Sequence, residues 1–122
     1  FTIDDRYSAT TFQGIMPDSG AAEHSTAGYQ QYLALRKLFG GELPLDTDRA
    51  GEARIRFGNG IYFVSKGTID VATPLDTLTF HVMPSNTPFL LCLADMDRRR
   101  IKFDNLTNQL IQGNTIVPVI RK

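Results

Sequence analysis

This chain has a single cysteine, no net charge and no long apolar run. Cys92 is the one cysteine in 122 residues, so no disulfide can form within the chain. This fits either a reducing compartment or a fold that needs no disulfide, and we expect an intracellular, cytoplasmic protein. The 13 basic and 13 acidic side chains balance, which removes the electrostatic reason to bind nucleic acid. No apolar stretch approaches the roughly 20 residues that cross a bilayer, so no membrane partner is expected.

What remains is the composition of one globular domain. Hydrophobic residues make up 42% of the chain, and 122 residues are enough to bury a core. The sequence has neither an internal repeat nor a low-complexity segment, so residues 1–122 are expected to form a single domain. Because the chain begins with Phe1, we expect it to be a segment of a longer polyprotein.

Hydrophobic periodicity predicts an all-β domain with one or two short helices. Tyr32, Leu35 and Phe39 recur at helical spacing over 29–39, and Gly40 and Gly41 follow as a stop signal. A shorter helix is expected at 95–99 and a polar loop at 42–51. Strands are expected at 1–3, 12–16, 53–57, 61–64, 68–71, 78–82, 88–93, 101–103, 109–111 and 115–120, the last at an edge because it contains Pro118.

The most informative motif is Asp18-Ser19-Gly20-Ala21, which follows the apolar residues 15–16. An aspartic protease presents its catalytic carboxylate in this way. An apolar strand runs into a tight turn, a hydroxyl braces the turn, and the glycine lets backbone and substrate approach closely. Asp-Ser-Gly is also an ordinary turn sequence, so the rest of the chain must decide between the two interpretations.

Two further segments carry information about the fold. Residues 53–57 alternate apolar and charged side chains, Gly58-Asn59-Gly60 follows, and 61–64 is again apolar, which predicts a hairpin with a glycine-rich tip. Residues 88–93 form a continuous apolar run, which predicts a strand buried on both faces.

The order of these segments resembles the retropepsin family of aspartic proteases, most closely the protease segment of LTR-retrotransposon polyproteins from fungi. The resemblance implies a closed β-barrel, an active site at a homodimer interface and Asp18 as the catalytic residue, with subunit contacts near 1–3 and 115–120. It rests on 14–21, 57–60, 65–67, 80–82, 87–98 and 118–122, nearly the whole chain. It also implies a mobile flap at Phe57, Gly58, Asn59, Gly60 and Ile61, and a second structural signature at Leu90, Leu91 and Cys92.

Three positions depart from the common retropepsin pattern. Pro17 stands where an aliphatic residue usually precedes the catalytic aspartate, and proline there removes a sheet hydrogen bond. Cys92 stands where the second signature usually has glycine. Ala22 replaces an acidic residue that often follows the Asp-Ser/Thr-Gly-Ala segment, with Glu23 beside it. These differences bear on subsites and dimer contacts more than on the chemistry.

Peptide hydrolysis by this chemistry needs two carboxylates that share one proton. The chain has a single Asp-Ser-Gly, at Asp18, so one chain cannot supply the pair and a symmetric homodimer can. The sequence therefore predicts an aspartic endopeptidase that needs no cofactor and acts on peptides, and the resemblance implies that it processes a polyprotein. The alternative is a catalytically silent retropepsin-like module that dimerises or binds peptides. The intact Asp18-Ser19-Gly20 favours the enzyme, whereas Pro17 and Cys92 keep the alternative in consideration.

The other candidate sites are weaker. His24, His81 and Cys92 lie far apart in the sequence, which argues against a metal site. His81 alternates with apolar neighbours in its strand and is expected to point to solvent, whereas His24 is expected at the surface or beside the site. Cys92 lies in the apolar run and is expected to be buried packing, not a nucleophile. Ser25 lacks the Gly-x-Ser-x-Gly context of a hydrolase nucleophile.

Overall fold

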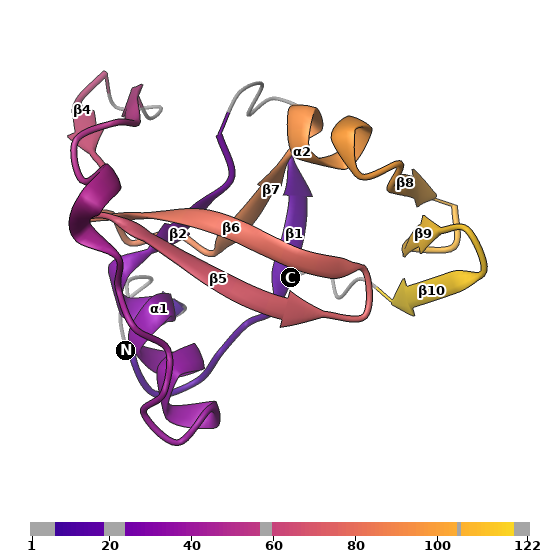
Figure 1. Ribbon diagram of the computed structural model, residues 1–122, viewed down its shortest axis with the longest axis horizontal. Helices are drawn as coiled ribbons and strands as arrows, with labels where there is room; N and C mark the ends of the chain where they lie inside the picture. The colour runs from indigo at the N-terminus through magenta and orange to yellow at the C-terminus, as the bar shows by residue number, and fades with distance from the viewer. Residues whose placement is uncertain (1–6, 19–23, 57–59, 105, 119–122) are drawn as a thin grey trace.

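A computed structural model describes residues 7–18, 24–56, 60–104 and 106–118 of the chain (Figure 1). The helices are α1 (Tyr29–Leu38), α2 (Leu93–Arg98) and a 3-10 turn, η2 (Thr47–Arg49). The strands are β1 (Ile15–Asp18), β2 (Thr26–Gly28), β3 (Arg54–Arg56), β4 (Tyr62–Val64), β5 (Thr68–Thr73), β6 (Asp76–Met83), β7 (Phe89–Cys92), β8 (Lys102–Asp104), β9 (Gln109–Gln112) and β10 (Thr115–Pro118).

These strands form three sheets, and no closed barrel is found in the described ranges. The main sheet has the order β1-β7-β2-β6-β5, β10-β9-β8 form a second sheet, and β3-β4 form a third. Figure 1 shows the β3-β4 hairpin at one end of the molecule and β8 to β10 at the other. The barrel expectation was wrong here because the hairpin and the last three strands pair among themselves and leave the main sheet open, with β1 and β5 at its edges.

The core lies between α1 and the main sheet. Phe80 and Phe89 are fully buried and meet edge to face, with ring centroids 5.0 Å apart. Tyr32 contributes from α1, and its hydroxyl donates a hydrogen bond of 2.8 Å to the carbonyl of Leu43. The predicted helix at 29–39 is thus confirmed within a residue, because its apolar side chains repeat at the spacing that faces this core.

The first strand begins later than the predicted 12–16. Gly14 has φ of +89°, a conformation outside the strand region, so the chain enters β1 only at Ile15. Phe12 still packs on the core, with its ring edge-on to Phe89 at 5.2 Å. Pro17 lies in an edge strand, where a residue without an N–H is tolerated. The predicted strand at 1–3 lies outside the described residues.

The short strand β2 has no counterpart among the predicted strands. Its three residues are all buried, so it shows no alternation, and it pairs parallel with β6 and antiparallel with β7. Gly28 ends it at a close approach, because a Cβ at that position would come within 2.1 Å of the carbonyl oxygen of Thr87. The position therefore requires glycine.

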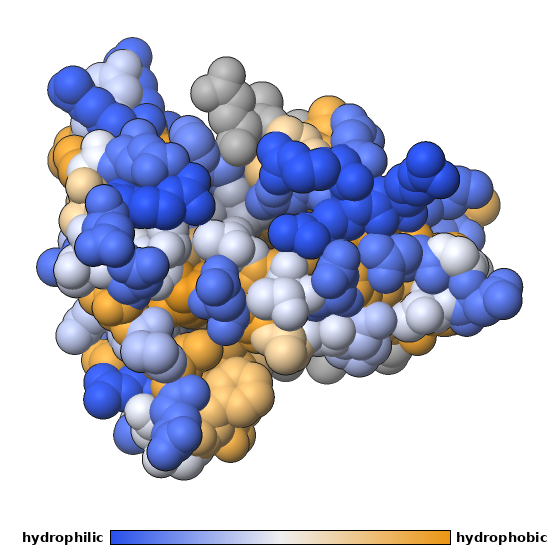
Figure 2. Space-filling model, in the orientation of Figure 1, coloured by the Kyte–Doolittle hydropathy of each residue, from blue (hydrophilic) through white to orange (hydrophobic). Residues whose placement is uncertain are grey.

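Most of the remaining elements match their predictions. The pairs β3-β4 and β5-β6 are antiparallel hairpins, and β10 lies at the edge that Pro118 predicts. In the view of Figure 2 hydrophilic side chains gather over α2, whereas apolar atoms gather toward α1. No helix in the described ranges is long and apolar enough to cross a membrane.

Candidate active site

Asp18 is the last residue of β1, and its position follows from the pairing of β1 with β7. The two strands run parallel in register, from Ile15 opposite Phe89 to Asp18 opposite Cys92. Because parallel strands end at the same edge of a sheet, the half-buried Asp18 lies at the carboxyl edge, beside the start of α2. Ser19, Gly20 and Ala21 lie outside the described residues.

The second signature of the sequence forms the strand beside Asp18. Leu90, Leu91 and Cys92 all lie in β7, and Leu91 and Cys92 are fully buried. The apolar run is therefore a buried strand, as predicted. Burial raises the pKa of the Cys92 thiol, which keeps it protonated near neutral pH and unsuited to nucleophilic attack.

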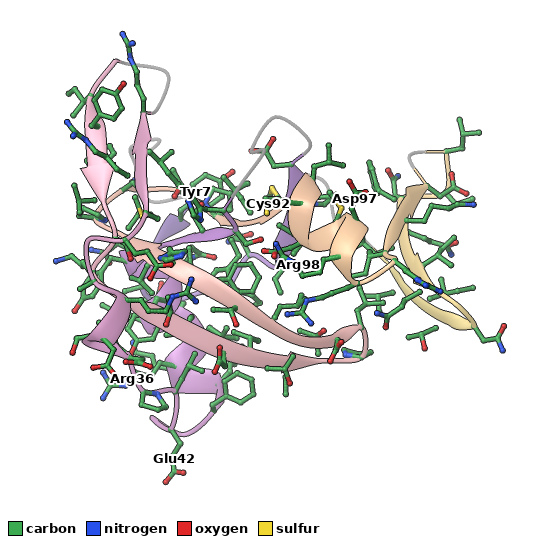
Figure 3. The ribbon with its side chains drawn as sticks, turned by 45° about the horizontal axis from the view of Figure 1, so that its top comes forward. Tyr7, Arg36, Glu42, Cys92, Asp97 and Arg98 are labelled. Atoms are coloured by element: carbon green, nitrogen blue, oxygen red, sulfur yellow. The ribbon has the colours of Figure 1, made fainter. Side chains whose placement is uncertain are left out.

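A hydrogen-bonded ring of Ser25, Cys92 and Asp95 closes the carboxyl end of β7. The backbone N–H of Cys92 donates to Ser25 Oγ at 2.9 Å, and Ser25 Oγ donates to Asp95 Oδ2 at 2.5 Å. The backbone N–H of Asp95 then donates back to Cys92 Sγ at 3.4 Å. Asp95 also forms an ion pair with Arg98, one turn further along α2. Figure 3 shows Cys92 and Arg98 at this junction, away from Arg36 and Glu42.

Opposing influences act on the pKa of Asp95. Burial raises the pKa of this carboxyl, but hydrogen bonds from Ser25 and Cys92, with the hydrogen bond and charge of Arg98, outweigh burial and lower it below its usual range. Asp95 therefore stays ionised into acidic solution.

His81 does not point to solvent, which corrects the sequence prediction. It is only 4% exposed, because β6 is a central strand and is buried on both faces from Phe80 to Met83. Its Nδ1 lies 3.0 Å from Ser65 Oγ, and its ring meets that of His24 edge to face at 5.1 Å. Burial, followed by the charges of His24 and Arg49, lowers the pKa of His81.

Two of the five proposed flap residues, Gly60 and Ile61, are described in the structure and lie beside the β3-β4 hairpin. Gly60 and Ile61 lead into β4, whereas Phe57, Gly58 and Asn59 lie outside the described residues. Ile61 and Tyr62 are more than half exposed. The base is buried instead: Ala53 is fully buried, and its carbonyl accepts a hydrogen bond of 2.9 Å from the N–H of Ser65.

Arginine side chains cover the outer face of this hairpin. The guanidinium carbons of Arg54 and Arg56 lie 4.7 Å and 5.8 Å from the centroid of the Tyr62 ring. Since side chains alternate along a strand, these residues share one face, while Ile55 and Phe63 occupy the other and are half-buried. The hairpin thus has one charged face and one apolar face.

Sequence reasoning singled out Asp18 and the hairpin but missed the ring of Ser25, Cys92 and Asp95. One signal was present: Asp95 stands three residues after Cys92, the spacing at which an N-cap residue and an acidic residue exchange hydrogen bonds at a helix start. Ser25 carried no such signal, because its partner lies 70 positions away. No group of three potential metal ligands occurs within the described part of the chain.

The chain is mostly β with two short helices, and its first strand ends in the motif aspartate beside a buried strand and a following helix. This arrangement matches a retropepsin-like fold. The retroviral protease-like domain of Ddi1 from Leishmania major is similar in structure, with a TM-score of 0.56 and 20% sequence identity. The alignment covers 88% of this chain and 83% of that one. The sequence matches no protein-family model and no curated protein.

Proposed function

We propose that the protein is an aspartic endopeptidase whose active site forms between two copies of the chain, each contributing Asp18. The observation that carries this proposal is the place of Asp18 in a retropepsin-like fold. It is half-buried at the carboxyl end of an edge strand and begins the Asp-Ser-Gly sequence. β1 lies at the edge of the main sheet, where a second subunit related by a two-fold axis can approach it.

In the proposed dimer the two Asp18 carboxylates share one proton, because like charges at close range cannot both ionise. The ionised carboxylate takes a proton from a water molecule as the water oxygen attacks the carbonyl carbon of the scissile peptide. The protonated carboxyl gives its proton to the carbonyl oxygen. Collapse of the tetrahedral intermediate breaks the C–N bond, and the leaving nitrogen takes a proton. The chemistry uses no cofactor.

The hairpin of β3 and β4 is proposed to cover the bound peptide. In Figures 1 and 3 it projects toward the same side of the molecule as the carboxyl end of β1. Closure would exclude water and offer backbone hydrogen bonds to an extended peptide. On the sequence resemblance to retrotransposon proteases, we propose that the natural substrate is a polyprotein, processed inside the cell.

Cleavage of a mixed peptide library by the wild-type chain, Asp18→Asn and Asp97→Asn tests the proposal. Asp97 is an exposed carboxylate on α2 that is not part of the Asp-Ser-Gly sequence, so Asp97→Asn is the same chemical change at a different carboxylate. We expect Asp18→Asn to lower kcat/KM by a factor of about 10³ or more, and Asp97→Asn to change it by less than about twofold. Wild-type turnover by Asp18→Asn would refute the proposal.

The same experiment tests the alternative, a retropepsin-like module without catalytic activity. A wild-type chain that dimerises and binds peptides from the library, but cleaves none of them, would be a silent binding module instead of an enzyme.

A further inference from the structure

At the carboxyl end of β7, Asp18 pairs with the interior of the main sheet. In the main sheet, β7 lies between β1 and β2, and Cys92 is the residue opposite Asp18. On its other side, β7 pairs with β2 at a single register position, Thr26 opposite Leu90. That pairing stops two residues before Cys92, so the ladder with β2 does not itself fix the end of β7.

The side chain of Ser25 binds the end of β7, which the ladder with β2 does not reach. It immediately precedes β2, is 1% exposed, and accepts the N–H of Cys92 at 2.9 Å. A hydroxyl has one proton to donate, and here Asp95 Oδ2 receives it at 2.5 Å. A hydrogen bond to a carboxylate is stronger than one to a neutral acceptor, so it fixes the rotation of the hydroxyl and leaves a lone pair of Oγ for Cys92.

Asp95 is held in turn from two sides. Its own N–H donates to Cys92 Sγ at 3.4 Å, and its other carboxylate oxygen, Oδ1, pairs with Arg98. The Asp95 side chain is 16% exposed whereas that of Arg98 is 64% exposed, so the ring of Ser25, Cys92 and Asp95 is shielded and the arginine closes it from outside. Strand, helix and the start of β2 thus meet in one hydrogen-bonded unit.

We propose that Ser25 is a positioning residue for the reaction, which acts through Cys92 to set where Asp18 sits, and that Asp95 and Arg98 hold its hydroxyl in place. The inference rests on the proposed function. Two carboxylates that share a proton must lie within hydrogen-bond distance of each other, and a displacement of about 1 Å in such a constellation can cost on the order of 10²-fold in rate. In a symmetric dimer, any shift of β7 would displace both Asp18 residues.

The test compares Ser25→Ala with Thr73→Val in the full chain. Thr73 Oγ1, at the end of β5, also donates to an oxygen and accepts an N–H, at 2.7 Å and 3.1 Å, from residues of the turn to β6. Active sites are counted by titration with a peptidic transition-state analogue, and kcat is expressed per titrated site. A merely structural hydroxyl lowers thermal stability and the number of sites but leaves kcat per site unchanged.

We expect Ser25→Ala to lower kcat per site by about tenfold or more with KM within about twofold, and Thr73→Val to leave both unchanged. Asp95→Asn keeps an oxygen that can accept the Ser25 hydroxyl but loses the charge, so kcat should fall by a smaller factor, about threefold or more. In the double variant Ser25→Ala/Asp95→Asn, the fall should be smaller than the product of the single ones, because both act through one ring.

The outcomes separate the two proposals. Wild-type activity that Asp18→Asn abolishes but Ser25→Ala leaves intact per site overturns the positioning role alone. Activity that survives Asp18→Asn overturns the proposed function, and the positioning role with it. If the Ser25→Ala chain does not fold, Asp95→Asn decides: a kcat per site equal to wild type overturns the positioning role, and a fall with unchanged KM supports it.

Discussion

Around Asp18, hydrogen bonds join a strand, a helix and a second strand, whereas the β3-β4 hairpin has its buried residues at its base and exposed side chains toward its tip. Cys92 and Ser25 are at most 1% exposed, but Ile61 and Tyr62 are 55% and 51% exposed. The difference matches what each region is proposed to do. A catalytic carboxylate must be held in place, whereas a cover over the substrate must open to admit it.

The largest expected difference between the two regions is in stability. Leu91→Ala removes a fully buried side chain from β7 and should lower the free energy of unfolding by about 2–5 kcal/mol. Tyr62→Ala removes a half-exposed ring and its contacts with Arg54 and Arg56, which should cost less than about 1 kcal/mol. Urea unfolding at one fixed chain concentration measures both, and equal losses would show that the hairpin is held as firmly as the strand.

A smaller effect is expected from Gly60→Val at the hairpin tip. Gly60 has φ of +81°, which a β-branched residue adopts only with strain, so the tip should distort and kcat/KM should fall on the order of tenfold. Gly41→Val is the matched control, because Gly41 has φ of +87° but follows α1, away from the hairpin. If both variants keep wild-type kcat/KM, the hairpin does not cover the substrate.

The smallest effect is expected from His81 and appears as a pH dependence of stability. The folded-state pKa of His81 is lowered, by burial first and then by His24 and Arg49, although Glu52 and Asp95 oppose this. The unfolded chain therefore binds the His81 proton more readily than the folded chain does. The contribution of neutral His81 to stability is present above pH 6.5 and is lost as pH falls from there toward the folded-state pKa.

His81→Asn keeps an acceptor near Ser65 but cannot take up this proton. Thermal melts between pH 7.5 and about pH 5 should show a smaller loss of Tm in the variant than in the wild type. An identical pH dependence in the two chains would mean that His81 does not contribute to it.

Hydrophobic periodicity predicted the elements whose side-chain pattern matches their burial in the structure. The repeat of Tyr32 and Leu35 gave α1, and the run at 88–93 gave the buried strand β7. The prediction that His81 points to solvent was wrong because alternation separates a buried from an exposed face only in strands that have an exposed face. From Phe80 to Met83, β6 is buried on both faces. The closed barrel was implied by the family resemblance and not by any strand pattern, and in the described residues the main sheet is open, with β1 and β5 at its edges.

The candidate site also contains some residues that local motifs predicted and others that they did not. Asp18 and the hairpin were found from contiguous motifs, whereas the Ser25–Asp95 hydrogen bond joins residues 70 positions apart and is set by how β2 and β7 meet. A single sequence contains no signal for such a contact between short polar side chains. The capping spacing of Cys92 and Asp95 was the only trace of it.

Mixing wild-type and Asp18→Asn chains tests the central claim, a dyad shared between two subunits, most directly. The chains are unfolded together, refolded at a constant total concentration and assayed on one peptide. If activity needs Asp18 from both subunits, hybrid dimers are inactive and activity follows the square of the wild-type fraction, so an equal mixture retains about one quarter. Activity that falls in proportion to the wild-type fraction, to about one half, would contradict the shared dyad.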